Sequence, residues 1–118
     1  MTPDDFLGDS VLGANVFAAV ERALAEFGNV EVTTTRSQIA FRRRRGFVYL
    51  WLPGKYLKAP QAEVVLSIAM DRKLTSRRFK EVTHASPRIW QHHLEIRDVA
   101  DVDAEVQGWL LEAYERAA

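Results

Sequence analysis

The sequence predicts an α+β fold, in which an antiparallel meander sheet of five or six strands is framed by an N-terminal and a C-terminal helix. Apolar residues recur at three- and four-residue steps near both ends of the chain and with period two between them. The connections between the predicted strands are short, and strands joined in this way pair antiparallel. Because strands and helices do not alternate along the chain, we do not expect a parallel nucleotide-binding fold.

Length and composition indicate a single domain that spans residues 1–118. Cysteine is absent, which excludes disulfides and thiolate metal sites and fits a reducing compartment. The acidic N-terminus lacks the order of a signal peptide, and no apolar run approaches the roughly 18–20 residues that span a bilayer. We therefore expect a cytoplasmic protein that does not enter the membrane.

The N-terminal region is expected to form a short turn followed by a longer helix. Thr2 can cap the turn, Pro3 suits its first position, and Ser10 can cap the helix. Gly28 supplies the left-handed residue that ends many helices. The apolar residues of the helix share one face: Leu12, Val16, Ala19, Val20, Ala23, Leu24 and Phe27.

Six segments have the alternation or the β-branched and aromatic content of strands. They span residues 30–35, 38–43, 47–52, 63–70, 79–84 and 89–97. The third and the fourth are apolar on both faces, so we expect them to be central and covered on both sides. In the third, Phe47 shares one face with Tyr49 and Trp51. The short fifth strand is expected at an edge of the sheet.

The C-terminal helix is expected to be capped by Asp98, with Asp101 three residues later in a box-like arrangement. Its apolar stripe comprises Val102, Val106, Trp109, Leu110, Ala113 and Ala117. For the protein core, the pattern predicts that five large residues are buried: Leu12, Leu50, Trp51, Leu66 and Trp109.

Charge is strongly segregated along a chain whose formal net charge is zero. Residues 36–80 carry twelve basic and two acidic side chains, a net of +10, whereas residues 1–35 and 81–118 each carry a net of −5. One interpretation is that acidic helices neutralise a basic sheet within the fold. The other is that the basic segment forms a surface for an anionic partner.

Several stretches resemble a known family over nearly the whole chain. They are Val30–Val32 leading into Ser37–Phe41, the aromatic segment Phe47–Leu52, the pair His92-His93, and Asp101–Asp103 running into Ala113-Tyr114. The family is a small uncharacterised bacterial one, a domain of unknown function, with relatives labelled "predicted transport protein". The matching positions imply a shared fold, and the resemblance implies no catalytic residues.

The histidines do not predict a metal site, and no motif predicts a cofactor. His92 and His93 are adjacent on a predicted strand, so their side chains point to opposite faces. His92 shares its face with Trp90 and Leu94, which predicts a core histidine with a satisfied hydrogen bond. His93 shares the other face with Glu95, as an acid–base pair or as part of a surface salt bridge.

The basic hairpin around Arg42–Arg45 is the most suggestive functional feature. It is flanked by Phe41 and Phe47, an arrangement that suits single-stranded nucleic acid if the rings are exposed. Turn and strand-edge hydrogen bonds also explain the nearby Ser37 and Gln38. The candidate ligand-binding residues are Ser37, Gln38, Arg42, Arg44, His93 and Glu95, with no catalytic or metal residues assigned.

Three functions follow from these observations. The first is a non-enzymatic binding or interaction domain for an anionic ligand or partner. We also expect it to form a homodimer, whose contact is made partly by an uncovered sheet face and partly by acidic helix against basic hairpin. The second is a small enzyme that uses His93 and Glu95 with an arginine as an anion clamp. The third is a domain that binds single-stranded nucleic acid through the basic aromatic hairpin.

Overall fold

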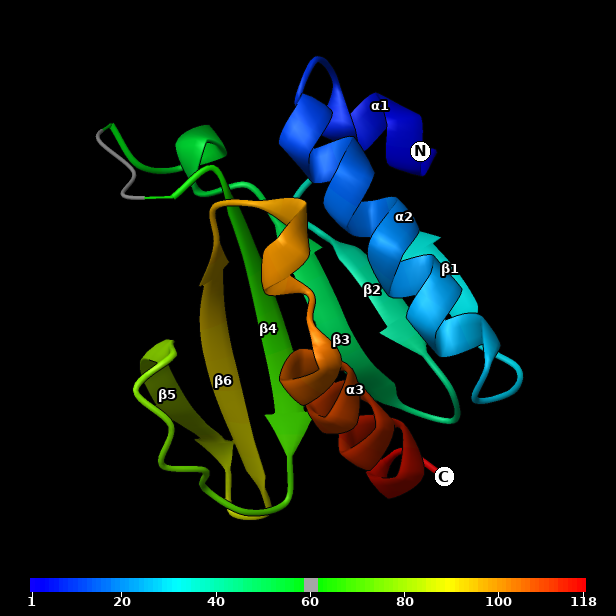
Figure 1. The fold of residues 1–118 in the computed structure, drawn as a ribbon, viewed down its shortest axis with the longest axis vertical. Helices are drawn as coiled ribbons and strands as arrows, with labels where there is room; N and C mark the ends of the chain where they lie inside the picture. The colour runs from blue at the N-terminus through cyan, green and yellow to red at the C-terminus, as the bar shows by residue number, and fades with distance from the viewer. Residues whose placement is uncertain (59–61) are drawn as a thin grey trace.

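A computed structural model describes residues 1–58 and 62–118 and has the predicted α+β fold. Six antiparallel strands form one sheet, and the helices lie together on one face of it (Figure 1). The strands are β1 (Glu31–Thr34), β2 (Ile39–Arg42), β3 (Gly46–Trp51), β4 (Val64–Met70), β5 (Phe79–Ser86) and β6 (Ile89–Ile96). No helix in the described residues is long and apolar enough to cross a bilayer.

The sheet departs from a simple meander in its last two strands. Its order is β1-β2-β3-β4-β6-β5, so β6 lies beside β4 and the fifth strand forms the outer edge, as predicted. Apolar content explains why β6 takes the inner place. Strand β6 buries His92, Leu94 and Ile96, whereas β5 buries only Phe79.

Three α-helices and two short 3₁₀ helices complete the fold. They are α1 (Pro3–Leu7), α2 (Val11–Ala25), η1 (Pro53–Lys55), η2 (Val99–Asp101) and α3 (Ala104–Arg116). Thr2 and Ser10 cap α1 and α2 as predicted. The prediction for the C-terminal helix was wrong in one respect: Asp98 caps η2, with Asp101 completing its capping box, and Asp103 caps α3. Each helical segment begins at its own capping aspartate, because η2 ends at Asp101, before α3 begins.

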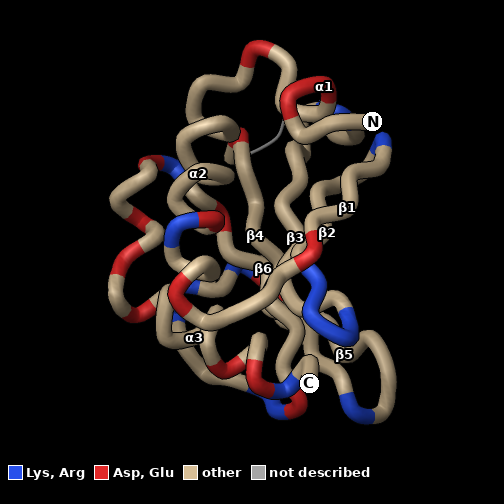
Figure 2. Tube along the Cα trace, turned by 90° about the vertical axis from the view of Figure 1, so that its right-hand side faces the viewer, with Lys and Arg blue, Asp and Glu red and all other residues tan. Residues whose placement is uncertain are grey.

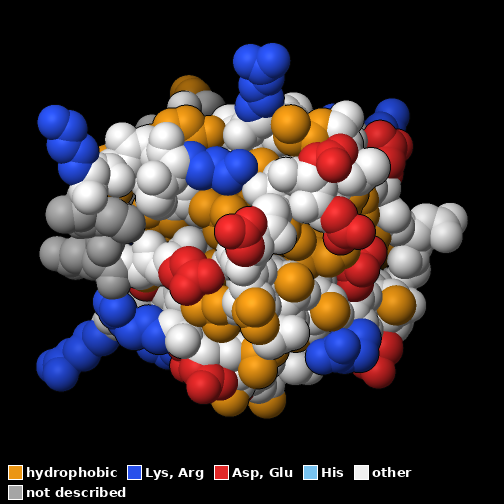
Figure 3. Space-filling model, turned by 90° about the horizontal axis from the view of Figure 1, so that it is seen from above, with side chains coloured by type: hydrophobic (Ala, Val, Ile, Leu, Met, Phe, Trp, Pro, Cys, Tyr) orange, Lys and Arg blue, Asp and Glu red, His pale blue; other side chains and the backbone are white. Residues whose placement is uncertain are grey.

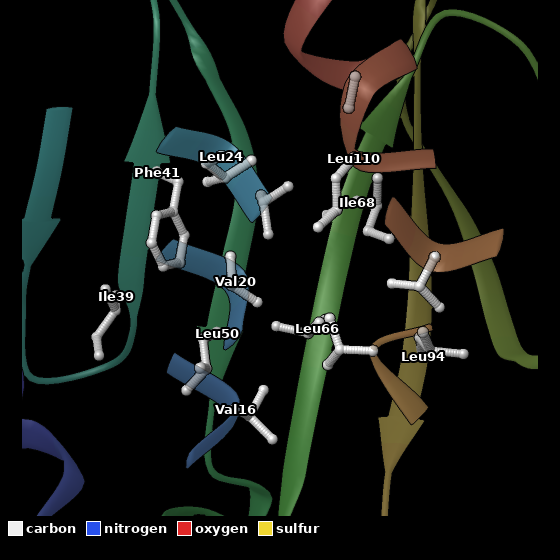
Figure 4. Close-up of a cluster of buried hydrophobic side chains, with 14 of the residues drawn as sticks. Val16, Val20, Leu24, Ile39, Phe41, Leu50, Leu66, Ile68, Leu94 and Leu110 are labelled. Atoms are coloured by element: carbon white, nitrogen blue, oxygen red, sulfur yellow. The ribbon is translucent and has the colours of Figure 1, made fainter. Parts of the chain in front are cut away.

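The core fills the space between the helices and one face of the sheet (Figure 4). Side chains of α2, such as Val16 and Val20, meet Phe41 and Leu50 of the sheet there. Leu50 and Leu66 are fully buried as predicted, but Leu12, Trp51 and Trp109 are only half-buried. The two tryptophans differ in position, because Trp109 packs beside Phe79 at the rim of the core and Trp51 lies on the opposite face of the sheet.

The predicted orientation of Phe47 was also wrong. The register between β2 and β3 shifts at Phe41/Arg42, where Arg42 pairs with Gly46 and Phe41 pairs with Val48. This β-bulge leaves Phe47 as an extra residue, and its ring turns to the helix side, where it packs edge-on against Tyr114. Tyr49 and Trp51 stay on the other face, and no described helix covers them.

Candidate ligand-binding face

The open face is the face of the sheet without helices, and the strand register defines its central residues. Across the strands it presents Ala40, Tyr49, Trp51, Val65, Ser67, Ala69, Gln91, His93 and Glu95. Both β3 and β4 are central as predicted, but the expectation of cover on both sides was wrong for β3, whose Tyr49 and Trp51 are only half-buried. The small β4 side chains on this face are nevertheless buried, with Ser67 at 5% exposure, because larger side chains from β3 and β6 lie beside them.

A row of hydrogen bonds crosses the open face from β3 to β5. Trp51 Nε1 donates to Ser67 Oγ at 2.9 Å, and Ser67 Oγ lies 2.7 Å from His93 Nδ1. His93 Nε2 lies 3.0 Å from Thr83 Oγ1, whose hydroxyl donates to Glu81 at 3.4 Å. The row is consistent with a neutral imidazole that accepts at Nδ1 and donates from Nε2. Burial lowers the pKa of His93, which favours this neutral form.

Two aromatic rings on β3 are held in place on this face. The bond from Trp51 Nε1 to Ser67 draws the indole across the sheet toward β4. Tyr49 lies along its own strand with its hydroxyl over Gly46. A Cβ atom added to Gly46 would come within 2.2 Å of Tyr49 Oη. The absence of a side chain at position 46 therefore gives the Tyr49 ring its place.

The arginine cluster comprises Arg42, Arg44, Arg45 and Arg116, which line a hollow at the hairpin end of the open face together with Tyr49 and Gln91. Arg116 reaches it from the last turn of α3 and donates to the Gly46 carbonyl at 3.1 Å. Its Nε and the Oε1 of Gln91 are buried and have no hydrogen-bond partner among the described residues. Burial, followed by repulsion from Arg45, lowers the pKa of Arg116.

Other basic residues of the middle segment are neutralised or used within the fold. Arg78 pairs with Asp103 and Glu105 at 3.0 and 2.9 Å. Arg72 pairs with Glu112 of α3, and Arg43 stacks on the Tyr114 ring. The interpretation that acidic helices neutralise the basic segment therefore holds for only some of the basic residues.

The arginine cluster differs from these residues, because no ion pair to any of its members occurs within the described chain. Figure 2 shows the basic run of the β2–β3 hairpin on the side away from α2 and α3. At the other end of the molecule, seen from above in Figure 3, basic, acidic and apolar side chains are intermixed. Unneutralised positive charge is therefore concentrated where the hairpin meets the open face.

The six residues predicted from the sequence all lie around this face, in three adjoining hollows. Ser37, Gln38 and His93 line the central hollow with the β3 aromatics, and Arg42 and Arg44 line the hairpin hollow. The third hollow joins Glu95 to His93 beside β5. Tyr49 and Gln91 line both the central and the hairpin hollows, so the two hollows are neighbours.

The structure does not place His93 and Glu95 in a hydrogen-bonded pair. Both ring nitrogens of His93 are engaged by Ser67 and Thr83. Glu95 instead pairs with Lys80 across the strands at 3.5 Å and with Arg97 at 3.1 Å. His93 and Glu95 therefore form separate contacts on one face.

His92 is the core histidine that its neighbours in the sequence predict. It is fully buried, its Nδ1 lies 3.2 Å from the carbonyls of Ile68 and Trp90, and its Nε2 accepts from the Leu74 amide at 2.9 Å. Burial lowers its pKa. The described residues contain no group of three or more histidine, aspartate or glutamate side chains that is placed to hold a metal ion.

Sequence reasoning missed the residues that join the predicted ones into a surface. These are Ser67, Gln91 and Arg116, whereas Tyr49 and Trp51 were already predicted to share one face of the third strand. Alternation does indicate which side chains share a face within one strand, but the register that sets Ser67 between Tyr49 and His93 has no such local signal. Arg116 belongs to a helix, and no pattern in the chain links it to the hairpin.

A model of the family described as "Domain of unknown function (DUF5655)" matches residues 5–117. The chain belongs to this family. The match spans both terminal helices and the whole sheet, so it agrees with the predicted extent of the resemblance. No curated protein and no solved structure matches the chain.

Proposed function

We propose that this domain is a non-enzymatic binding module that takes an anionic ligand on its open face. The observation that carries the proposal is the arginine cluster, which places four arginines in the lining of one hollow, with no ion pair to them among the described residues. Like charges held together raise the free energy of the unliganded fold, and an anion relieves this repulsion.

The chemistry of the cluster favours an oxyanion such as a phosphate. Guanidinium groups present several donors in a fixed fork, which matches the oxygens of phosphate and carboxylate groups. The buried Nε of Arg116 has no hydrogen-bond partner among the described residues, and an anion that reached it would supply an acceptor. The same anion would counter the desolvation and repulsion that lower the pKa of Arg116.

The contacts of the open face favour binding over the enzymatic alternative. An acid–base pair of His93 and Glu95 needs the two groups to cooperate, yet each is bonded to other side chains. The candidate arginines Arg42 and Arg44 line a different hollow from the one that joins His93 to Glu95. The homodimer stays a prediction, and contact of its acidic helix with the hairpin would compete with the ligand for the same arginines.

Calorimetric titration with inorganic polyphosphate tests this function, because the probe carries charge without rings. We expect the triple variant Arg42→Gln, Arg44→Gln, Arg45→Gln to bind at least about 10-fold more weakly than the wild type, as each lost charge-assisted hydrogen bond contributes roughly 1.5–3 kcal/mol before partial compensation.

The matched control replaces three exposed basic residues outside the cluster, Arg22, Lys73 and Arg77, with glutamine. It removes the same formal charge, and we expect its affinity for polyphosphate to stay within about twofold of the wild type, because the remote charges are screened over about 8–10 Å. Equal losses of affinity in both triple variants would show that net charge, and not the arginine cluster, determines binding. No binding by the wild type would refute the proposed function.

A further inference from the structure

We infer that the anionic ligand is a single-stranded nucleic acid, with phosphates on the arginine cluster and bases stacked on Tyr49 and Trp51. This inference rests on the proposed function and adds the class of ligand. The central hollow, which both rings line, adjoins the hairpin hollow, and Tyr49 and Gln91 line both. A ligand that joins planar rings to a charged backbone fits an aromatic hollow beside a basic one.

The spacing of the two rings suits successive bases. Tyr49 and Trp51 lie two residues apart on one strand and one face, which places their Cα atoms roughly 6.5–7 Å apart. Open antiparallel sheets that bind single-stranded RNA use aromatic residues on a sheet face in the same way, with two or three stacked bases. Here the positively charged hairpin follows directly along the strand from Tyr49.

Both rings are fixed before any ligand arrives. The Ser67 hydroxyl holds the Trp51 indole, and Ser67 is in turn bonded to His93, so the hydrogen-bonded row across the open face orients a stacking platform. Tyr49 lies over Gly46. Ordered rings lose little conformational entropy on binding, which favours stacking.

Polar groups beside the rings can meet the edges of stacked bases. Gln38, Gln91, Ser37 and His93 line the same central hollow. The exposed Ser37 hydroxyl and the half-buried Gln38 amide can exchange hydrogen bonds with base edges. A protein surface as partner would need acidic groups against the arginines and a flat apolar contact, whereas the open face mixes rings with polar side chains.

Fluorescence anisotropy with labelled oligothymidylate of about ten nucleotides tests the inference, with an abasic oligonucleotide of equal length as the comparison. We expect the wild type to bind the base-containing strand at least about 10-fold more tightly. Trp51→Leu and Tyr49→Leu should each lose about 5- to 150-fold for that strand, the range measured for a lost stacked base, while binding to the abasic strand changes little.

Two further variants separate stacking from folding defects. Trp51→Phe keeps a ring and should retain most of the affinity. Trp90→Leu removes a half-buried tryptophan that stacks on His84, away from the open face, and should leave binding unchanged. Raising salt from 50 to 200 mM should weaken binding about 20- to 50-fold if three or four phosphates are contacted.

The outcomes distinguish this inference from the proposed function. If polyphosphate and the abasic strand bind as tightly as oligothymidylate, the anion-binding function stands and the nucleic-acid inference fails. Loss of affinity in Trp90→Leu equal to that in Trp51→Leu would also overturn the inference. If neither oligothymidylate nor polyphosphate binds the wild type, both fail.

Discussion

Gly46 links the local conformation of the hairpin to the shape of the ligand face. Its backbone takes part in the bulge that turns Phe47 toward α3, and its missing side chain leaves space for the Tyr49 ring. Its carbonyl oxygen also accepts the bond from Arg116. One residue therefore positions a ring and an arginine of the candidate site.

We expect Gly46→Ala to weaken oligonucleotide binding while it changes the free energy of unfolding by no more than about 1 kcal/mol. The new Cβ would lie 2.2 Å from Tyr49 Oη, the end of a flexible side chain, so the ring shifts rather than the backbone. Gly108→Ala on α3 is the control, because no atom lies within 4 Å of its new Cβ. It should stabilise the fold by roughly 0.5–1 kcal/mol without an effect on binding. Unchanged binding in Gly46→Ala would contradict the assigned place of Tyr49.

We predict that His92 makes the fold less stable in mild acid. Its folded-state pKa is lowered by burial, so the unfolded chain binds the proton more readily. The stabilising contribution is present above the unfolded pKa of about 6.5 and is lost as the pH falls below it, by at most about 1.4 kcal/mol per pH unit for one histidine. Burial also lowers the folded-state pKa of His93, so His93 likewise makes the fold less stable as the pH falls.

Urea unfolding of the wild type and of His92→Gln between pH 8 and pH 5 measures this effect. The variant should be less stable at pH 8, since glutamine has no donor at the place of Nδ1, which lies against the Ile68 and Trp90 carbonyls, and its stability should fall less steeply with acid. A wild-type free energy of unfolding that stays constant over this pH range would show that the imidazole is not held neutral by the core.

At the scale of elements, the N-terminus of α3 combines a cap with an ion-pair network. Asp103 accepts from the Val106 amide at 3.1 Å and binds Arg78 through both carboxylate oxygens. The hydrogen bond from the Val106 amide, followed by the hydrogen bond from Arg78, lowers the pKa of Asp103. Arg78 extends the junction by donating to the Asp101 carbonyl and to Glu105.

The cap should contribute more stability than the exposed ion pair. We expect Asp103→Ala to lower the free energy of unfolding by about 1 kcal/mol, within the range measured for lost N-caps. Asp103→Asn keeps the acceptor and should lose less, because exposed ion pairs contribute about 0–1 kcal/mol. Urea midpoints of the two variants give the comparison, and an equal loss in both would assign the stability to the ion pair.

Local sequence patterns predicted the elements well and their arrangement less well. Period-two alternation located all six strands to within about two residues, and capping residues located α1 and α2. The order of β5 and β6 and the bulge at Phe47 depend on contacts between distant segments, so alternation within one strand could not reveal them. Asp98 has a good capping pattern, but a short 3₁₀ turn uses it before α3 begins.

At the scale of the whole molecule, the two faces of the sheet differ in what lies against them. The helices and the core occupy one face, and the predicted site residues lie around the other (Figures 1 and 4). The sequence indicated the basic segment and six residues of the site, but not that Arg72 and Arg78 would be neutralised while the arginine cluster would not. That distinction depends on which basic residues lie within reach of Asp103, Glu105 and Glu112.

The central claim is that an anionic ligand binds the open face at the arginine cluster, and a two-dimensional ¹H–¹⁵N NMR titration with polyphosphate tests it most directly. We predict shifts confined to backbone amides of the hairpin, of the adjoining parts of β3 and β6, and to the side-chain groups of the arginine cluster and Gln91. The amides of α2, on the other face, should stay unchanged. Shifts centred on α2, or a spectrum that does not respond to polyphosphate, would contradict the account.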